Sequence, residues 1–576
     1  MKKYFQSCLS HNEAIYVVFF ILCIGNQVVL AQSKSKIENY TFPPKYEFRA
    51  VWIATINNID FPSRAGLSAE QQQEEFRRLL DFHQKNGMNA VIVQVRPAGD
   101  AFYQSDLEPW SQWLTGKQGE APYPFYDPLS FMIEETHKRN MEFHAWLNPF
   151  RAVANIYSDK LHPSHIVHKK KDWFLNYGQL KLFNPGIPEV REYLVSVVAD
   201  VVKRYDVDGI HFDDYFYPYP DPQYKLKDDA TFKKYGKGFK RLADWRRENL
   251  NLFIKGVHEA IKKEKSFVKF GVSPYGVWRN LREDAYGSNT RSGYTCYDHL
   301  HADIRHWLKE GWIDYVAPQL YQHRQHKTNP YKELVEWWAD NSFGKHVYIG
   351  NAPYRIHWDN DPNWKSNTEM PEQLRYSRGF TYVKGNIFYS SRALLKNRGG
   401  FTDSLRQHFY NHPAIVPLMP WKDSIAPLPP SNPVVSLTPK GVVLSWLSPE
   451  KAKDGELPSY YVIYRTPSTQ TPDVHNPRHL HKTLPSHVTS WKDEEAKSID
   501  DFKYIITSMD RLKNESSFEI VKHFEPVLPK PVLIAGQSPD HVRMLTNLAV
   551  QNIQLFLNVQ ENAISEDDLV DKAEEK

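Results

Sequence analysis

The sequence predicts an α/β fold, a (β/α)8 TIM-type barrel followed by a small all-β sandwich. From Phe48 onward, short apolar runs alternate with longer amphipathic segments, a pattern typical of β/α units around a parallel sheet. Eight such runs precede a change of composition near Ala426, and eight is the strand number of a closed α/β barrel. Polar residues gather directly after most runs, where barrels of this kind carry their active sites.

The apolar runs define the expected barrel strands. Each run is short, and amphipathic segments with helical spacing separate one run from the next. In chain order we expect strands at 49–55, 90–95, 142–147, 209–212, 268–272, 315–319, 346–350 and 386–389.

Three of the intervening segments carry clear helix signals. The segment 68–86 begins with Ser68 in an N-cap position and stops before Gly87. The segments 188–205 and 298–311 place apolar residues at helical spacing, and the second ends in a glycine. We therefore expect helices over these three ranges.

The N-terminus has the composition of an export signal. Two lysines precede an apolar run over 14–24, and the small residue Ala31 offers a cleavage point. We expect a signal peptide over 1–31, followed by a barrel domain over 32–425. The sequence thus predicts an exported protein of the periplasm, cell envelope or extracellular space, with no transmembrane segment after signal removal.

Beyond the proline-rich linker at 427–430 the sequence is that of short alternating strands. Trp446, the tyrosine-rich run 460–465 and the run 502–508 resemble a fibronectin type III module, which we expect over 426–522. Residues 523–576 form a tail with a helical pattern at 542–559 and an acidic end.

Charge and cysteine content exclude several classes of function. The net charge of +4 over 576 residues gives no electrostatic footprint for nucleic acid. After signal removal the chain keeps only Cys296, which excludes an internal disulfide and a thiolate metal cluster. His299, His301 and His306 fit no standard metal spacing, so we expect surface histidines, no metal and no cofactor.

The segment 208–219 is the most informative part of the chain. The apolar strand 209–212 runs directly into Asp213 and Asp214, and four aromatic residues follow within the next five positions. Burying a carboxylate costs free energy unless it is paired with a positive charge or hydrogen-bond donors, so two acids at the end of a buried strand indicate a functional role. Aromatic faces beside acids suit a sugar ring. The alternative is a helix N-cap, in which one aspartate accepts backbone N–H bonds.

Strand alternation assigns the side chains of this segment to two faces. His211, Asp213 and Tyr215 share the face toward the barrel mouth, and Asp214 lies on the other face. We expect Asp213 to be catalytic. Asp214 is a second catalytic candidate, with bracing of the loop or capping of the next helix as its alternative role.

Glycoside hydrolysis usually needs a second carboxyl group. Side chains of adjacent residues diverge from an extended backbone, so Asp213 and Asp214 are expected to be a poor pair. Asp100 is our preferred second acid, with Asp60 and Glu283 as alternatives. Substrate assistance by an N-acetyl group, which needs one enzyme acid, stays open.

Polar and aromatic residues at the strand ends are the expected substrate-binding groups. The arginines have an ion pair with a rim acid as their alternative role, and the rings have core packing. The expected residues are Arg96, His144, Asn148, His211, Tyr215, Tyr217, Tyr275, Trp278, Gln319, Tyr321 and Arg355.

Four ordered stretches, 48–55, 94–103, 209–218 and 311–321, resemble the glycosyl hydrolase-like 10 family over about residues 46–400. The resemblance implies a (β/α)8 glycosidase fold and, as in some relatives, cleavage of peptidoglycan glycan strands. We expect an exported glycoside hydrolase acting on an amino-sugar polysaccharide. The alternative is a non-catalytic carbohydrate-binding or surface-adhesion protein on the same scaffold.

Overall fold

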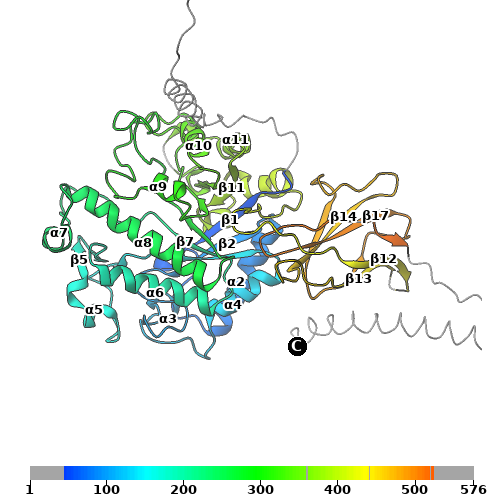
Figure 1. Cartoon of the computed structure of the whole chain (residues 1–576), viewed down its shortest axis with the longest axis horizontal. Coiled ribbons are helices and arrows are strands. Elements are labelled where there is room, and N and C mark those ends of the chain that lie inside the picture. The colour runs from blue at the N-terminus through cyan, green and yellow to red at the C-terminus, as the bar shows by residue number, and fades with distance from the viewer. Residues whose placement is uncertain (1–43, 359–360, 440, 519, 524–576) are drawn as a thin grey trace, which may run out of the picture.

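The computed structural model describes residues 44–358, 361–439, 441–518 and 520–523. Figure 1 shows two parts side by side, a barrel with its helices and a smaller set of sheets formed by the end of the described chain. The expected signal peptide and almost the whole expected tail lie outside the described residues.

The larger part is a closed barrel of eight parallel strands in the order β1-β11-β10-β9-β8-β7-β3-β2. Every strand overlaps one of the eight expected runs, so the predicted barrel is confirmed. The strands are β1 Phe48–Ile53, β2 Ala90–Arg96, β3 Glu142–Leu147, β7 Gly209–Phe212, β8 Lys269–Val272, β9 Tyr315–Val316, β10 His346–Asn351 and β11 Val383–Phe388.

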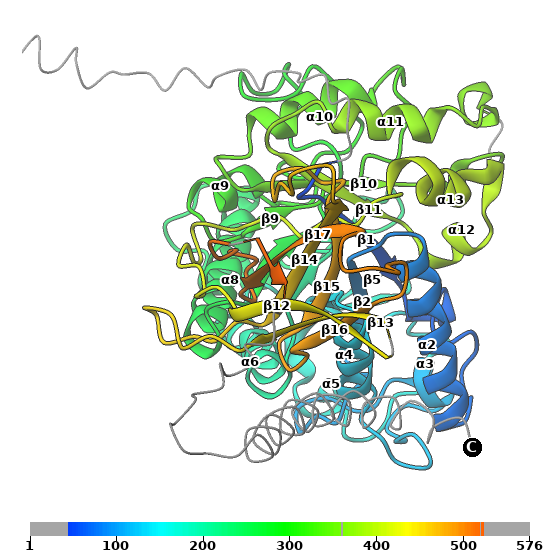
Figure 2. The same cartoon turned by 90° about the vertical axis from the view of Figure 1, so that its right-hand side faces the viewer.

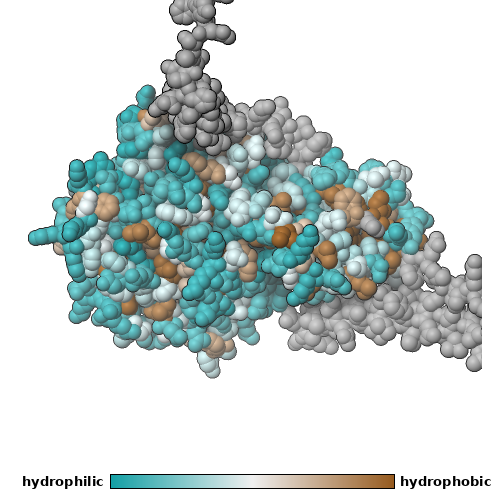
Figure 3. Space-filling view, viewed as in Figure 1, coloured by the Kyte–Doolittle hydropathy of each residue, from teal (hydrophilic) through white to brown (hydrophobic). Residues whose placement is uncertain are grey.

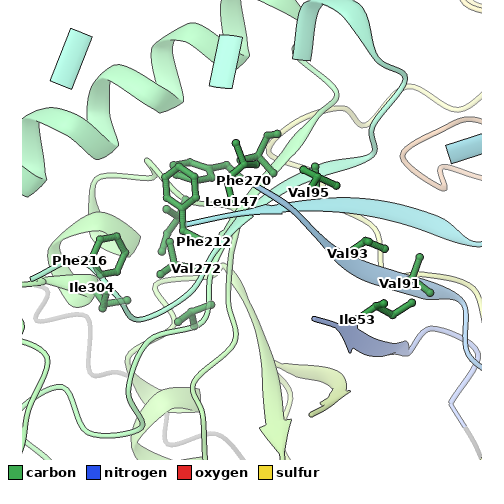
Figure 4. Close-up of a cluster of buried hydrophobic side chains, with 14 of the residues drawn as sticks. Ile53, Val91, Val93, Val95, Leu147, Phe212, Phe216, Phe270, Val272 and Ile304 are labelled. Carbon is green, nitrogen blue, oxygen red and sulfur yellow. The ribbon is translucent and has the colours of Figure 1, made fainter. Parts of the chain in front are cut away.

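Strand alternation separates two layers of buried side chains. One layer packs between the strands and the surrounding helices, and Figure 4 shows part of it, including Val91, Phe212 and Phe270. The other layer, which includes Phe48 and Tyr348, fills the barrel interior. Each fully buried apolar side chain contributes about 1.5–3 kcal/mol, so the two layers hold the barrel closed.

Helices of unequal length surround the barrel. Helix α2 begins as expected, because Ser68 Oγ accepts from Gln71 N at 3.2 Å and Gln71 Oε1 accepts from Ser68 N at 3.1 Å. The main helices are α2 Ala69–Lys85, α4 Pro128–Lys138, α6 Pro188–Arg204, α8 Leu242–Glu264, α9 Ile304–Lys309, α10 Tyr331–Asp340, α11 Glu369–Ser377, α12 Ser391–Leu395 and α13 Phe401–Ser404.

The helix expected over 298–311 is shorter in the structure. Helix α9 starts only at Ile304, because the Asp303 side chain caps it by accepting from His306 N at 3.2 Å. His299 and His301 therefore lie on the turn before the helix, and the predicted start was wrong by six residues.

An insertion after β3 adds a small antiparallel sheet beside the barrel mouth. Its strands are β4 Arg151–Val153, β6 Leu180–Phe183 and β5 Phe174–Tyr177, in that order. Three short helices belong to the loops of the same half of the barrel, α3 Gln112–Thr115, α5 Ile166–Lys169 and α7 Asp229–Tyr235.

The smaller part consists of two sheets packed face to face. Val442 and Leu444 of one sheet and Tyr461 and Ile463 of the other belong to one buried cluster. The first sheet has the order β16 Ser490–Asp493, β13 Gly441–Leu447, β12 Ser431–Thr438, β18 Lys522–His523, and the second β15 Leu480–Pro485, β14 Tyr460–Pro467, β17 Phe502–Met509. The all-β sandwich is thus observed, and its kinship with fibronectin type III modules stays a prediction.

The sandwich covers the N-terminal ends of the barrel strands. Figure 2 shows its sheets in front of the barrel, with helices arranged around them. Arg511 donates to Asp208 Oδ1 at 2.9 Å, directly before β7, and Lys513 Nζ lies 3.7 Å from Glu142, the first residue of β3. The opposite, C-terminal ends of the strands are left for the loops that form the barrel mouth.

On the face shown in Figure 3, hydrophobic residues are scattered among hydrophilic ones and form no continuous band. Within the described ranges, no helix combines the length and the apolar character needed to cross a bilayer.

The ion pair between Lys269 and Glu142 is expected to be a main support of the barrel base. Lys269 Nζ lies 2.6 and 2.7 Å from the Glu142 oxygens, and both side chains are buried. Burial alone would raise the pKa of Glu142, but Lys269 and His144 hold it at about 2. Lys269→Met should lower the free energy of unfolding by about 3–5 kcal/mol, because it leaves a buried charge without its main partner.

Denaturant unfolding measures this loss. The double variant Lys269→Met/Glu142→Met is the control and should recover part of the stability, since both members of the pair are removed together, while the nearby Lys513 keeps the attraction of Asp208. Equal losses in the single and double variants would contradict the assignment.

Candidate active site

The mouth of the barrel contains a cleft made of two adjoining cavities. The smaller has a volume of about 270 Å³ and the larger about 730 Å³. Four residues line both cavities, so these residues mark the junction: Trp146, Asp213, Tyr215 and Tyr389. A concave cleft with carboxylates and aromatic walls at the C-terminal ends of barrel strands is the usual place for an active site.

Strand β7 delivers Asp213 to the junction. Ile210 and Phe212 pack toward the helices, and His211 points into the barrel, as alternation predicted. Asp214 lines the smaller cavity together with Asp213. The expectation of divergence assumed an extended backbone, whereas β7 ends at Phe212 and the chain then turns, with Phe216 N donating to Asp214 O at 3.0 Å.

A chain of amides fixes the Asp213 carboxyl group. Asn148 Nδ2 donates to Asp213 Oδ2, and Tyr215 N donates to Asp213 Oδ1 at 3.2 Å. Gln94 Nε2 in turn donates to Asn148 Oδ1 at 2.6 Å, and Gln94 Oε1 accepts from Thr55 N at 3.0 Å. Side chains from β2 and the end of β3 thus hold the acid that follows β7.

Asp214 has a separate support. The hydroxyl group of Tyr219 donates to Asp214 Oδ2, and Tyr219 also lines the smaller cavity. Gln319 and Tyr321, both expected to bind substrate, line the same cavity. The two acids therefore share one cavity but have different hydrogen-bond partners.

Burial sets the protonation of the pair. It raises the pKa of Asp213 to about 7, and the neighbouring Asp214 adds to the shift, while Arg151 and Asn148 oppose it. Burial also raises the pKa of Asp214, against the hydrogen bond from Tyr219. Two neighbouring carboxyl groups in one cavity oppose the ionisation of both at once, which favours a state in which one of them keeps its proton, as a general acid must.

His211 and His144, which were expected to bind substrate, lie below the cavity floor, in the barrel interior. Trp52 Nε1 donates to His211 Nε2 at 3.2 Å, so His211 carries its proton on Nδ1, 3.0 Å from the Tyr315 hydroxyl group. His144 Nδ1 lies 2.9 Å from the same hydroxyl group. Both histidines thus support the floor, and neither is among the residues that line the cleft.

Arg96 and Asp100 do not reach the cleft either. Arg96 forms the ion pair that was its alternative role, with Nε 2.7 Å from Glu108 Oε2. Asp100 is buried and bonded to Ala98 N at 3.2 Å and to Gln118 Nε2 at 3.3 Å, and burial raises its pKa to about 7. The pKa of Asp100 is therefore raised because the side chain is buried inside the loop after β2, away from the cleft.

The other acids considered as partners also lie elsewhere. Asp60 accepts from Ala54 N at 2.8 Å and from Ser390 Oγ at 2.7 Å, and Glu283 pairs with its neighbour Arg282. Neither lines either cavity.

Four further expected binding residues have packing or bracing contacts. Tyr217 and Trp278 are buried, and the Trp278 indole donates to Asp303 Oδ1 at 3.0 Å. The Tyr275 hydroxyl group bonds to Ser292 Oγ at 3.0 Å. Arg355 Nη1 donates to Tyr321 O at 2.9 Å and so braces the backbone of a cavity residue.

Several residues that line the cleft were not among those predicted from the sequence. Trp52 and Trp146 point inward by strand alternation, since Trp146 shares the face of Asn148. Tyr389 follows β11 directly, so its place at a strand end was a usable signal. Arg151 belongs to the inserted sheet, and no pattern in the sequence predicts this sheet. The Arg151 guanidinium lies 4.5 Å from the Tyr215 ring centre.

Among the residues that the structure describes, no three histidine, cysteine, aspartate or glutamate side chains come together as a metal site would need.

Comparisons with known proteins identify the family of the chain. The sequence model of the family described as glycosyl hydrolase-like 10 matches residues 47–366. Glycosyl hydrolase YngK of Bacillus subtilis strain 168 is 44% identical over 475 residues, which cover 82% of this chain and 92% of YngK. Glycosyl hydrolase DigH of Escherichia coli K12 is 39% identical over 371 residues, which cover 60% of this chain and 84% of DigH.

Among solved structures, the PgaB glycoside hydrolase domain of Bordetella bronchiseptica aligns with a TM-score of 0.41 at 13% identity, over 63% of this chain and 98% of that domain. The family match spans more than half of the 576 residues. The chain therefore belongs to the glycosyl hydrolase-like 10 family, a family of glycoside hydrolases.

Proposed function

We propose that this glycoside hydrolase cleaves an amino-sugar polysaccharide, such as the glycan strands of peptidoglycan, with Asp213 as the proton donor. The observation that carries the proposal is the pair of buried carboxyl groups, Asp213 and Asp214, in one cavity walled by aromatic rings. Two carboxyl groups astride a glycosidic bond are the common requirement of glycoside hydrolysis.

Asp213 is the better proton donor of the two. Its raised pKa keeps a large fraction of the group protonated near neutral pH, and it lies at the junction of the two cavities, where a bond between two sugar units would pass. Transfer of its proton to the glycosidic oxygen lets the C–O bond break, and the resulting carboxylate then takes a proton from the attacking water.

Asp214 is proposed as the second carboxyl group. Burial raises its pKa, and the hydrogen bond that the Tyr219 hydroxyl group donates to it opposes that rise. A carboxylate in this place stabilises the positive charge that develops on the sugar ring, or orients an N-acetyl group that attacks in its stead. Gln319, which lines the same cavity, has a side-chain amide of the kind that forms hydrogen bonds with an acetamido substituent.

Aromatic rings provide the apolar surface that a pyranose ring needs. Trp52, Trp146 and Tyr321 line the smaller cavity, and Tyr389 lines both. The pattern of the first 31 residues supports export, so we propose the periplasm, cell envelope or extracellular space as the place of action.

A carbohydrate-binding or adhesion protein is the second candidate, because the aromatic cleft would also suit a binder. The buried carboxyl pair favours the enzyme, since a binder has no need to hold two acids against the cost of burial.

Asp213→Asn is expected to lower kcat by about 10²- to 10⁴-fold on peptide-free peptidoglycan strands, because it removes the proton donor. Binding of the same strands should persist. Turnover is measured by mass spectrometry of the products, and binding by calorimetry.

Asp100→Asn is the matched control for this variant. Asp100 is equally buried and its pKa is also about 7, yet it lies outside the cleft, so Asp100→Asn should keep full turnover. Loss of turnover in a folded Asp100→Asn protein, with activity kept in Asp213→Asn, would reverse the assignment.

The pH dependence of kcat/KM should show a falling limb near pH 7, as Asp213 loses its proton. Asn148→Ala removes a donor to the ionised carboxyl group, which disfavours the charged form. The limb should therefore move upward by about one pH unit, the effect of one hydrogen bond to a charged group. A limb that stays in place, or moves down, would argue against Asp213 as its origin.

A further inference from the structure

Exposed aromatic residues continue the walls of both cavities away from the acid pair. One row leaves the smaller cavity, where the ring centres of Tyr321 and Tyr389 each lie 6.2 Å from that of Tyr354. The ring of Trp358 follows, 5.5 Å from Tyr354. The Trp358 side chain is 65% exposed, an unusual state for the largest apolar residue type.

A second row lies along the larger cavity. Tyr157, which is 81% exposed, lines it together with Tyr177 and Tyr224. Tyr177 and Tyr224 meet edge to face with ring centres 5.8 Å apart. Tyr157 and Tyr177 come from the inserted sheet and its loops, and Tyr224 comes from the loop after β7, so none of the three belongs to a strand of the closed barrel.

Packing does not account for the two outermost rings. A tryptophan buried in a core loses its contact with water, whereas Trp358 keeps most of its surface in solvent and contacts Tyr354 at an angle of 68°. Water-exposed aromatic faces in line with an active-site cleft are suited to the apolar faces of sugar rings, since such stacking removes the exposed surface from water.

We infer that the cleft holds an extended glycan, which runs from Tyr157 in the larger cavity past Asp213 into the smaller cavity and out over Tyr354 and Trp358. Trp358 and Tyr157 are then the outer sugar-binding platforms. Because the chain continues beyond the acid pair in both directions, the enzyme cuts within glycan strands and not at their ends. This inference rests on the proposed function, since it adds the mode of attack to it.

The test uses the full-length protein with two probes, long peptide-free peptidoglycan strands and a tetrasaccharide of the same repeat. In the Asp213→Asn background, Trp358→Ala and Tyr157→Ala should each weaken binding of the long strands roughly two- to tenfold, the effect of one lost ring contact. The tetrasaccharide can cover fewer rings at once than a long strand, so at least one of the two changes should weaken its binding less than that of the long strands. Trp358→Phe keeps a ring and should restore most of the affinity.

Tyr123→Ala is the matched control. Tyr123 is 88% exposed and lies outside both cavity linings, so its removal should alter neither binding nor turnover. The wild-type enzyme should shorten long strands throughout from the first time points, as measured by size-exclusion chromatography.

Two results would overturn the inference. One is unchanged affinity for long strands in both Trp358→Ala and Tyr157→Ala, and the other is release of end units alone while the mean strand length persists. Strands that bind through both platforms but are never cleaved by the wild-type protein would instead refute the proposed function and leave the extended binding site intact.

Discussion

The burial of two carboxyl groups at the end of β7 is the constraint on which the rest of the site depends. The ionised forms are costly there, so the pKa of Asp213 rises to about 7. Because the folded protein then binds a proton that the unfolded chain releases above its ordinary pKa, the group costs stability as the pH rises through this interval. Asn148, held by Gln94, limits the cost by donating to the charged form.

A continuous chain of hydrogen-bonded side chains runs through the barrel interior below the acids. The indole of Trp52 can only donate, which fixes the tautomer of His211, and the Tyr315 hydroxyl group joins His211 to His144. His144 Nε2 then lies 3.2 Å from Glu142, the carboxylate that pairs with Lys269. A fully bonded column of this kind holds the cavity floor in one arrangement, because any break leaves a buried polar group without its partner.

The sequence predicted the barrel well because its signal is local and repeated: each apolar run and each helix pattern adds to the same count. Among the residues it predicted for the site, Asp213, Asp214, Tyr215, Gln319 and Tyr321 line the cleft, since strand ends of a barrel converge, and Asn148 supports Asp213 from beneath. It failed for Arg96, His144 and His211, because a strand-end residue can also turn down into the interior or pair with a loop acid such as Glu108. The place of Arg151 depends on how the inserted sheet folds back on the barrel, which no run of residues encodes on its own.

The two ends of the barrel have separate tasks. The sandwich meets the N-terminal end through Arg511 and Lys513. Trp421, which precedes the linker, adds a contact there, because its indole donates to Asp314 Oδ1 at 2.8 Å. Within the described chain, no residue beyond 389 lines either cavity of the cleft. The sandwich instead covers charged residues such as Glu142 and Asp208 that begin or precede the strands. The two acids lie at the opposite end, in a cleft that the inserted sheet and the loops after the strands leave open.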